Sequence, residues 1–391
     1  MLHRKNVAAS RPTTRVAIIT DSIYPYNKGG KEMRLYQITT RLAEQGADVH
    51  IYTMKWWDGP SHIVDQGVQL HAISKHYPLY AGQRRSIRQG IMFALACLKL
   101  AGPSFHPDVI EVDHMPYFPL FTMKLVALVK RRPLLATWHE VWGGTYWRQY
   151  LGPIGGTIAA TLERLTILMP NKIIASSQPT AERLQAMFHV KKPIVVISNG
   201  VDAEQIASVA PGVVQSDIIY AGRLLGHKNV DMIVRAVATL AVSHPTIRCV
   251  IIGDGPERER IQQLAHELRV SQHIQFLGFL GDHSDVIGYL KASKVFAFPS
   301  TREGFGITVL EANAAGVPVI TPDYPDNAAR TLIHEGQNGL LCAPEPADLA
   351  EKIALILDGE VHFTKKIIKA QVASYHWGAI AEQASKLWQV S

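Results

Sequence analysis

Two glutamates, Glu303 and Glu311, stand eight positions apart, and the start of a predicted helix lies between them. Residues 294–300 have the apolar character of a buried strand, and 306–315 are predicted to form a helix. The first N–H groups of a helix lack internal partners, so they can donate to a phosphate. The two carboxylates can accept hydrogen bonds from the hydroxyls of a ribose and of a second sugar. The alternative is an ordinary loop at Glu303 and a solvated helix face at Glu311.

Glycines near two predicted helix starts favour the phosphate-binding interpretation. Gly304 and Gly306 lie in the loop before the helix, where the absence of a Cβ lets a diphosphate approach the backbone closely. Gly29 and Gly30 begin another predicted helix after the strand at 15–20. Alone, this second pair would be typical of a flexible turn, and its importance comes from its position.

Two cations, Arg223 and Lys228, follow the predicted strand at 217–222 and are five positions apart. Because ligands bind at the carboxyl ends of parallel strands, we expect both cations to lie near a ligand. There they would neutralise a diphosphate leaving group as the glycosidic bond breaks. The alternative is that both are solvated surface residues.

A histidine, His139, follows the predicted strand at 134–138 and precedes Glu140. Near neutral pH its ring can donate or accept a hydrogen bond at a sugar hydroxyl. The alternative is a structural histidine, since the chain has 17 of them. The aromatic and glycine-rich segment 141–153 predicts an acceptor loop, because aromatic rings suit both sugar faces and lipid interfaces.

These motifs together resemble the retaining glycosyltransferases of the GT-B fold, family 4 type (glycosyltransferase group 1). The segment 303–320 (EGFGITVLEANAAGVPVI) is similar to the family's E-x7-E element, and 222–228 to its G-R-x4-K element. The resemblance covers nearly the whole chain and is strongest over 199–341. One departure is the loop 322–327, where the family usually has a small glycine-rich turn, which leaves the donor contacts of this loop open.

The resemblance implies a role for each motif. The implied catalytic residues are His139 at the sugar hydroxyls, Arg223 and Lys228 on the phosphates, and Glu303 at the donor sugar. The implied donor-binding residues are Gly29, Gly30, Gly278, Phe279, Gly304, Phe305, Gly306, Ile307 and Glu311, with Gly278 and Phe279 in the base-contacting loop and Glu311 at the ribose. The implied mechanism is front-face displacement with retention, in which the leaving phosphate helps to deprotonate the acceptor. It needs no metal and no cofactor besides the nucleotide-sugar co-substrate.

Sequence patterns typical of metal sites and of dinucleotide-binding sites are absent or incomplete. No D-x-D motif, H-E-x-x-H motif or Cys/His cluster is present. The run 253–256 begins like a dinucleotide fingerprint, but Arg258 occupies the position of its third glycine, so we predict a turn beside the nucleotide.

The strand pattern predicts an α/β fold with two doubly wound, Rossmann-like domains that face an interdomain cleft. At 391 residues and 47% hydrophobic composition, the chain is long enough for two or three domains. We predict an acceptor-binding domain at 1–200, a nucleotide-sugar-binding domain at 201–374, and a C-terminal helix at 375–391 that packs back on the first domain. The predicted strands are 15–20, 49–53, 108–112, 134–138, 172–176 and 194–197, then 217–222, 248–253, 274–277, 295–298 and 318–321.

Charge is distributed unevenly along the chain. Residues 1–200 carry 24 Lys and Arg against 12 Asp and Glu, whereas 201–391 carry 16 against 21. A basic first half favours an anionic acceptor or an anionic membrane surface. Residues 77–100 combine three arginines with an apolar face, which predicts either an interfacial helix or a core helix with a solvated basic start.

The three cysteines, Cys97, Cys249 and Cys342, lie far apart in apolar runs and are expected to be reduced core residues. Neither a secretory signal nor a membrane-spanning run is visible in the sequence. We therefore expect a cytoplasmic protein that can also be peripheral at the inner membrane face.

The leading functional hypothesis is a hexosyltransferase that moves a sugar from a UDP- or GDP-linked donor to a hydroxyl of a glycan, lipid or small molecule. One alternative is a nucleotide-sugar 2-epimerase of the same architecture. Another is a non-enzymatic basic binding module, although no nucleic-acid motif is present. The sequence does not identify the donor sugar, the base, the acceptor or the oligomeric state.

Overall fold

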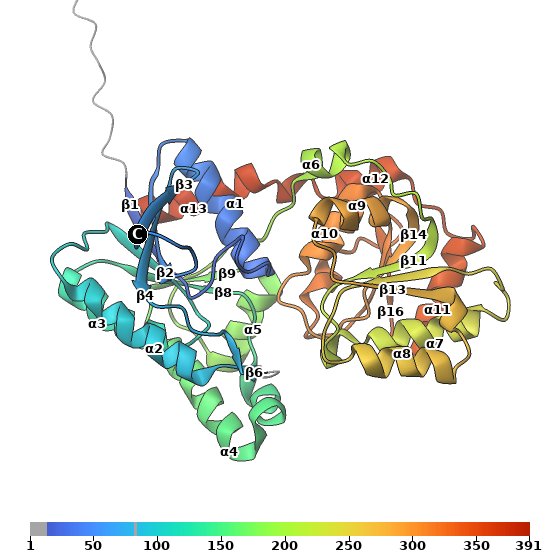
Figure 1. Cartoon of the computed structure of the whole chain (residues 1–391), viewed down its shortest axis with the longest axis horizontal. Coiled ribbons are helices and arrows are strands. Elements are labelled where there is room, and N and C mark those ends of the chain that lie inside the picture. Colours follow the sequence, from blue (N-terminus) through green and yellow to red (C-terminus); the bar gives the residue numbers. More distant parts are fainter. Residues whose placement is uncertain (1–13, 82–83) are drawn as a thin grey trace, which may run out of the picture.

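The computed structural model describes residues 14–81 and 84–391, and it contains two parallel sheets, each covered by helices on both faces (Figure 1). The first sheet has eight strands in the order β10-β9-β8-β7-β1-β2-β4-β3, and its edge strand β3 is antiparallel to β4. The second sheet has six parallel strands in the order β13-β12-β11-β14-β15-β16. The predicted α/β class with two doubly wound, Rossmann-like domains is confirmed.

The strands agree with the predicted ranges to within a few residues, except that β3, β4, β16 and a short hairpin were not predicted. β3 and β16 are edge strands. The residues of β3 are mostly exposed, so the apolar signal of β3 is weak. In the first sheet the strands are β1 (Arg15–Ile19), β2 (Asp48–Met54), β3 (His62–Asp65), β4 (Val68–Ser74), β7 (Val109–Asp113), β8 (Leu134–Trp138), β9 (Lys172–Ala175) and β10 (Ile194–Val196). In the second sheet they are β11 (Ser216–Ala221), β12 (Cys249–Ile252), β13 (Ile274–Gly278), β14 (Ser293–Ala297), β15 (Val319–Pro322) and β16 (Gly339–Cys342). The hairpin pairs β5 (Tyr80–Ala81) with β6 (Arg84–Arg85).

Helices alternate with the strands. The first part of the chain contains α1 (Gly30–Glu44), α2 (Ile87–Cys97), η1 (Leu98–Ala101), α3 (Phe118–Lys130), α4 (Gly143–Thr166) and α5 (Gln178–Phe188). The second contains α6 (Ala203–Ser208), η2 (Gly226–Lys228), α7 (Val230–Leu240), α8 (Arg258–Glu267), η3 (Ser271–His273), α9 (His283–Lys291), α10 (Ile307–Ala315), η4 (Ala328–Leu332), α11 (Pro346–Leu357), α12 (Lys365–Ala370) and η5 (Ala373–Tyr375), before α13 (Trp377–Gln389).

The segment 77–100 is helical only from Ile87 onward. The hydroxyl of Ser86 accepts a hydrogen bond from the backbone N–H of Gln89, which caps α2 at this point. The preceding arginines Arg84 and Arg85 lie in the β5–β6 hairpin and not on a helix, so the prediction of one continuous helix was wrong in this part. Within the described residues, no helix is long and apolar enough to cross a membrane.

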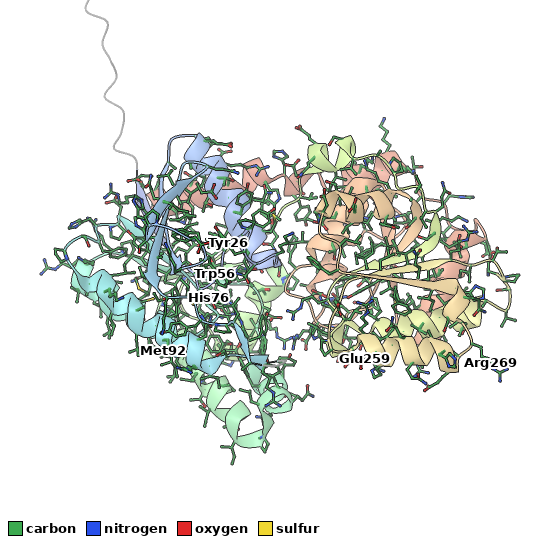
Figure 2. All side chains as sticks on the ribbon, viewed as in Figure 1. Tyr26, Trp56, His76, Met92, Glu259 and Arg269 are labelled. Carbon is green, nitrogen blue, oxygen red and sulfur yellow. The ribbon has the colours of Figure 1, made fainter. Side chains whose placement is uncertain are left out.

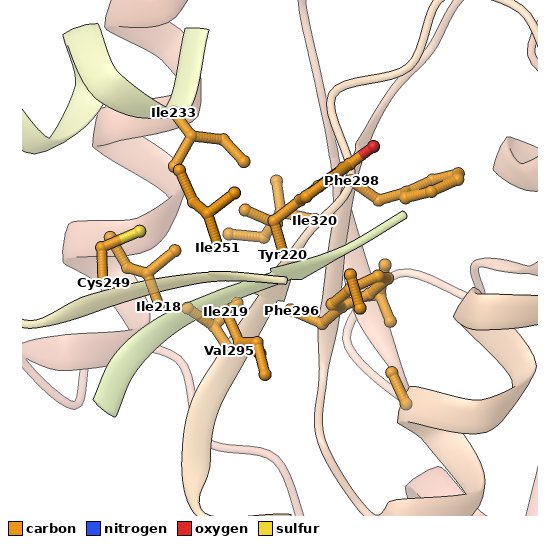
Figure 3. Packing of buried hydrophobic residues seen from close by; sticks show 14 of the residues in the cluster. Ile218, Ile219, Tyr220, Ile233, Cys249, Ile251, Val295, Phe296, Phe298 and Ile320 are labelled. Atoms are coloured by element: carbon orange, nitrogen blue, oxygen red, sulfur yellow. The ribbon is translucent and has the colours of Figure 1, made fainter. Parts of the chain in front are cut away.

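Buried apolar side chains form the cores of both halves of the molecule, and Figure 2 shows the side chains on the ribbon. In the second half, Tyr220 of β11 and Phe296 of β14 are fully buried between the sheet and its helices, next to Phe298 (Figure 3). Near-continuous apolar strands of this kind are expected where a parallel sheet is covered on both faces. The three cysteines are buried free thiols, as expected.

The chain crosses between the two sheets twice, and the crossings run side by side. The backbone N–H of Val201 donates to the carbonyl of Tyr375 at 2.8 Å, and Val201 forms a β-bridge with His376. Beyond this point α13 packs against α1, and its residues Trp377 to Trp388 join the core of the first sheet (Figure 1). We propose these crossings as the domain boundaries.

Candidate active site

Each sheet has a point at which the strand order reverses, and charged side chains gather there. β1 lies between β2 and β7, and β11 lies between β12 and β14. Asp21 follows β1 and Asp113 ends β7, whereas Arg223 follows β11 and Glu303 follows β14. Because open α/β sheets bind ligands at the carboxyl ends of the strands beside such a point, these four residues mark the candidate site.

His139 is held by a buried network of charges. Its Nε2 lies 3.0 Å from Oδ1 of Asp113, and Oδ2 of Asp113 lies 3.4 Å from Nζ of Lys31. Lys31 also contacts Asp21 at 2.8 Å, and Arg85 lies 3.4 Å from the same carboxylate. Burial alone would raise the pKa of Asp113, but Lys31 and His139 hold it well below its usual range. The Asp113 carboxylate therefore stays ionised and fixes the ring of His139.

The predicted catalytic residues Lys228 and Glu303 contact each other directly, since Nζ of Lys228 donates to Oε1 of Glu303. The same Nζ lies 5.3 Å from the centre of the Phe298 ring. The backbone of Glu303 is held by the loop 322–327: its N–H donates to the carbonyl of Asp326 at 3.0 Å, and Glu303 forms a β-bridge with Asn327. The loop that departs from the family pattern thus holds the backbone of Glu303, the residue that the resemblance implies at the donor sugar.

Arg223 reaches across to the first domain. Its guanidinium lies 3.4 Å from the hydroxyl of Tyr80, and its Cζ is 5.5 Å from the ring centre. Arg85 contacts the same ring at 5.6 Å, so Tyr80 links the two halves of the site. Beside Arg223, burial and then the charges of Arg302, Lys228 and Arg223 lower the pKa of His227 to about 3. Three cationic side chains therefore lie near His227.

The glycine-rich helix starts of the two domains lie close together. A Cβ on Gly304 would be 1.8 Å from the carbonyl oxygen of His139, and one on Gly30 would be 3.2 Å from Cδ1 of Ile307. The hydroxyl of Thr180 donates to the carbonyl of Gly304 at 3.2 Å. Gly304 thus permits an approach of the two domains that any side chain at this position would block.

The predicted base-contacting loop also meets the first domain. Gly278 ends β13 with a φ of +71°, a left-handed conformation that favours glycine. Phe279 is 66% exposed, and Nζ of Lys28 lies 5.8 Å from its ring centre. Lys28, which precedes Gly29, donates to the carbonyl of Gly281 at 3.0 Å. The two glycine-containing loops therefore face each other across the domain boundary.

Glu311 faces a different part of the boundary from Glu303. It lines a pocket of about 430 Å³ between α1, α6, α9 and α10, together with Ile307 and His283. Nε2 of His283 lies 3.1 Å from Oε1 of Glu311, and this hydrogen bond raises the pKa of His283. The structure therefore places Glu311 and Glu303 in separate cavities and pairs each of them with a basic side chain.

The helix start between them differs from the prediction in one respect. Gly306 caps α10 with a φ of +104°, as a glycine readily does. The side chain of Phe305 is buried and packs on Tyr375, with ring centres 5.9 Å apart. Only the backbone of Phe305 is therefore positioned to meet a donor.

Comparison with known proteins identifies the family. The family model described as Glycosyl transferases group 1 matches residues 191–372, and the model described as Glycosyltransferase Family 4 matches residues 28–205. The chain belongs to the group 1 glycosyltransferases of the GT-B fold. Glycogen synthase of Mycobacterium tuberculosis (strain CDC 1551 / Oshkosh) is 24% identical over 96% of this chain and 94% of its own length. The gpi3 subunit of phosphatidylinositol N-acetylglucosaminyltransferase from Schizosaccharomyces pombe is 22% identical over 95% of this chain and 79% of its own length.

Solved GT-B glycosyltransferases share the fold. Sucrose-phosphate synthase from Thermosynechococcus elongatus superposes with a TM-score of 0.77 at 21% identity, over 96% of this chain and 98% of the other. Anabaena HepE in complex with UDP and glucose superposes with a TM-score of 0.70 at 20% identity, over 97% of this chain and all of the other.

The structure of this glycosyltransferase adds charged residues that the sequence interpretation missed, namely Asp21, Lys31, Arg85 and Asp113. For Asp21 and Asp113 a signal existed, because each stands at the carboxyl end of a strand beside the reversal of strand order. Arg302 was also missed, although it directly precedes Glu303. Its guanidinium carbon lies 3.5 Å from the ring centre of Tyr146 and 5.1 Å from that of Trp142, so the aromatic segment 141–153 does reach the cleft.

Proposed function

We propose that this protein is a retaining hexosyltransferase that transfers a sugar from a UDP- or GDP-linked donor to a hydroxyl of a glycan, lipid or small molecule. The observation that carries the proposal is the contact of Lys228 with Glu303, beside His139, at the carboxyl ends of the strands. The solved HepE complexes with UDP and glucose, and with UDP-glucose, support a nucleotide-sugar donor. Family membership favours transfer over the epimerase and binding-module hypotheses.

In the proposed mechanism the donor diphosphate lies against Arg223 and Lys228. As the bond between sugar and phosphate lengthens, negative charge grows on the phosphate, and two fixed cations stabilise this charge more in the transition state than in the ground state. Lys228 then exchanges part of its interaction with Glu303 for the phosphate, which leaves the Glu303 carboxylate to accept hydrogen bonds from sugar hydroxyls.

In this proposal the configuration at the anomeric carbon is retained, because the acceptor attacks from the same face of the sugar that the phosphate leaves. The acceptor oxygen forms its bond to the anomeric carbon as the bond to the phosphate oxygen breaks, and the departing phosphate takes the acceptor proton. His139 holds a donor hydroxyl through Nδ1, because its Nε2 is engaged by Asp113. The proposed reaction needs no metal ion, since Arg223 and Lys228 supply the positive charge.

We also propose a cytoplasmic location with peripheral attachment to the inner membrane face. The three buried free thiols support a reducing compartment. The excess of 24 Lys and Arg over 12 Asp and Glu in residues 1–200 supports attraction to an anionic surface.

Calorimetric titration with UDP, GDP, ADP and the corresponding nucleotide sugars tests the proposed function. We expect one nucleotide family to bind, and Glu311→Ala to weaken this binding at least tenfold. Glu351→Ala is the matched control, because this glutamate is exposed on α11 at the far side of the second domain. If no nucleotide binds the native protein, the proposed function is wrong.

A further inference from the structure

The helices α2, α3 and α4 expose an unusual amount of apolar surface. Of the 23 large hydrophobic residues that are exposed in the described chain, 11 lie on these helices or at their ends. Single exposed apolar residues are normal, but a contiguous group of them marks an interaction surface. The 11 residues, here called the α2–α4 face, are Ile87, Ile91, Leu95, Leu98, Leu125, Leu128, Val129, Ile154, Ile158, Leu165 and Leu168.

The spacing of these residues aligns them along the helices. On α2 and its extension η1, Ile87, Ile91, Leu95 and Leu98 follow one another at intervals of four, four and three residues. This is the spacing of one helix face, while Phe93 and Cys97 of the same helix face the core. On α4, the exposed stripe runs from Ile154 to Leu168 in the same way. Both helices thus have an apolar outer face in addition to a buried inner face.

The three helices lie on one side of the first domain (Figure 1), and Met92 in Figure 2 marks α2 on this side. They also contact one another. Tyr117, at the start of α3, packs on Trp147 of α4 with ring centres 5.8 Å apart. The backbone N–H of Arg85, just before α2, donates to the hydroxyl of Tyr150 in α4 at 3.0 Å. The helices that carry the exposed stripes are therefore joined to one another on this side of the domain.

The charges on this surface have a single sign. The helices α2, η1, α3 and α4 contain six Lys and Arg residues and one carboxylate. This carboxylate, Glu163, is buried and accepts hydrogen bonds from the backbone of Trp142 and Gly143 and from the indole of Trp147. The basic residues are Arg88, Lys99, Lys124, Lys130, Arg148 and Arg164.

We propose that the α2–α4 face docks on an anionic lipid bilayer. An apolar helix face flanked only by Lys and Arg is the arrangement that inserts into the headgroup region of such a membrane. A bilayer rich in anionic lipid offers negative charge over a wide area, which matches the single sign of the charges on this face. Since α4 begins four residues after His139, docking would bring the first-domain side of the cleft to the lipid surface. The inference that the membrane presents a lipid-linked acceptor rests on the proposed function. The inference that the α2–α4 face binds the membrane does not depend on that function.

Co-sedimentation of the full chain with vesicles tests this proposal. We expect binding to vesicles of phosphatidylcholine and phosphatidylglycerol in equal parts, weaker binding to phosphatidylcholine alone, and release by salt. Ile91→Ser/Leu95→Ser should weaken binding at least tenfold. Arg88→Gln/Arg164→Gln should weaken it by about fivefold for each charge removed.

Matched controls come from the second domain. Val242→Ser/Leu268→Ser removes exposed apolar residues, and Arg235→Gln/Arg248→Gln removes exposed charges, so both should leave vesicle binding unchanged. Equal binding by native protein and Ile91→Ser/Leu95→Ser would overturn the proposal, as would the absence of binding to anionic vesicles. Concentration-dependent self-association that Ile91→Ser/Leu95→Ser abolishes would instead make the face a contact between two copies. Nucleotide binding, measured on the same variants, keeps a failure here distinct from a failure of the proposed function.

Discussion

Nε2 of His139 and Oδ1 of Asp113 lie 3.0 Å apart and join the carboxyl ends of the neighbouring strands β8 and β7. Lys31 approaches the other oxygen of Asp113 at 3.4 Å and connects the pair to Asp21. The histidine at the proposed reaction centre is therefore oriented by a carboxylate that is itself held by a buried cation.

Replacement of this carboxylate, Asp113→Asn, should reduce the free energy of unfolding by about 3 kcal/mol at neutral pH, because Lys31 loses one of its two buried partners. The depressed pKa of Asp113 means that its contribution is present above the ordinary carboxyl pKa of about 4 and is lost as the pH falls below it. Urea unfolding at neutral and acidic pH should thus show a difference between native and variant that shrinks on acidification. Asp358→Asn, at an exposed pair with His244, is the control. A difference that does not change with pH would contradict this account.

Lys228→Ala should lower turnover by about 100-fold or more if Lys228 stabilises the departing phosphate, and Arg223→Ala should act in the same direction. Steady-state kinetics with the donor found by calorimetry would measure this. Lys228→Arg keeps the charge and should restore part of the activity. Lys294→Ala, which breaks a pair with Asp217 near the amino ends of β14 and β11, is the control. Full activity of Lys228→Ala would remove Lys228 from the mechanism.

Most strands of the two sheets were predictable because they are almost continuous apolar runs that turn residues separate from the helices, whereas the missed strand β4 (VQLHAIS) mixes apolar and polar residues. The start of α10 was predictable for a similar reason, since Gly306 and Gly316 bracket it. β3, with mostly exposed residues, carries no such signal. The sequence also suggested one helix over 77–100, whereas Arg84 and Arg85 belong to a hairpin that is set by contacts with distant residues such as Tyr150.

The contacts between side chains in the site could not be predicted from the sequence. Lys31 and Asp113 are 82 positions apart, and their contact depends on β1 and β7 being neighbours, which no local pattern specifies. In the same way, Arg223 was predicted to face a phosphate, but its contact with Tyr80 depends on how the two domains close. Spacing therefore identified the residue types at strand ends, whereas their partners follow from topology.

Glu311 pairs with His283 in the structure, and we expect this pair to make nucleotide affinity depend on pH. The hydrogen bond raises the pKa of His283 above its ordinary value of about 6.5, so at low pH the protonated ring holds the carboxylate. A ribose that displaces the ring lowers this pKa and releases a proton, which means that affinity should rise as the pH increases through the raised pKa. Calorimetry across this range should show the rise in the native protein and not in His283→Ala. An identical pH dependence in both would contradict the role of the pair.

Gly304→Ala tests whether the close approach of the two domains is part of the active arrangement. The added Cβ would lie 1.8 Å from the carbonyl oxygen of His139, a backbone atom that cannot rotate away, so the domains would have to separate locally. Because a displacement of about 1 Å can cost about 100-fold in rate, we expect turnover to fall by this order while nucleotide binding changes little. Gly288→Ala, inside α9, is the matched control, since the nearest atom found for its added Cβ is the carbonyl oxygen of Ala210 at 3.5 Å, an ordinary contact. Unchanged turnover in Gly304→Ala would mean that the transfer step takes place with the two domains further apart.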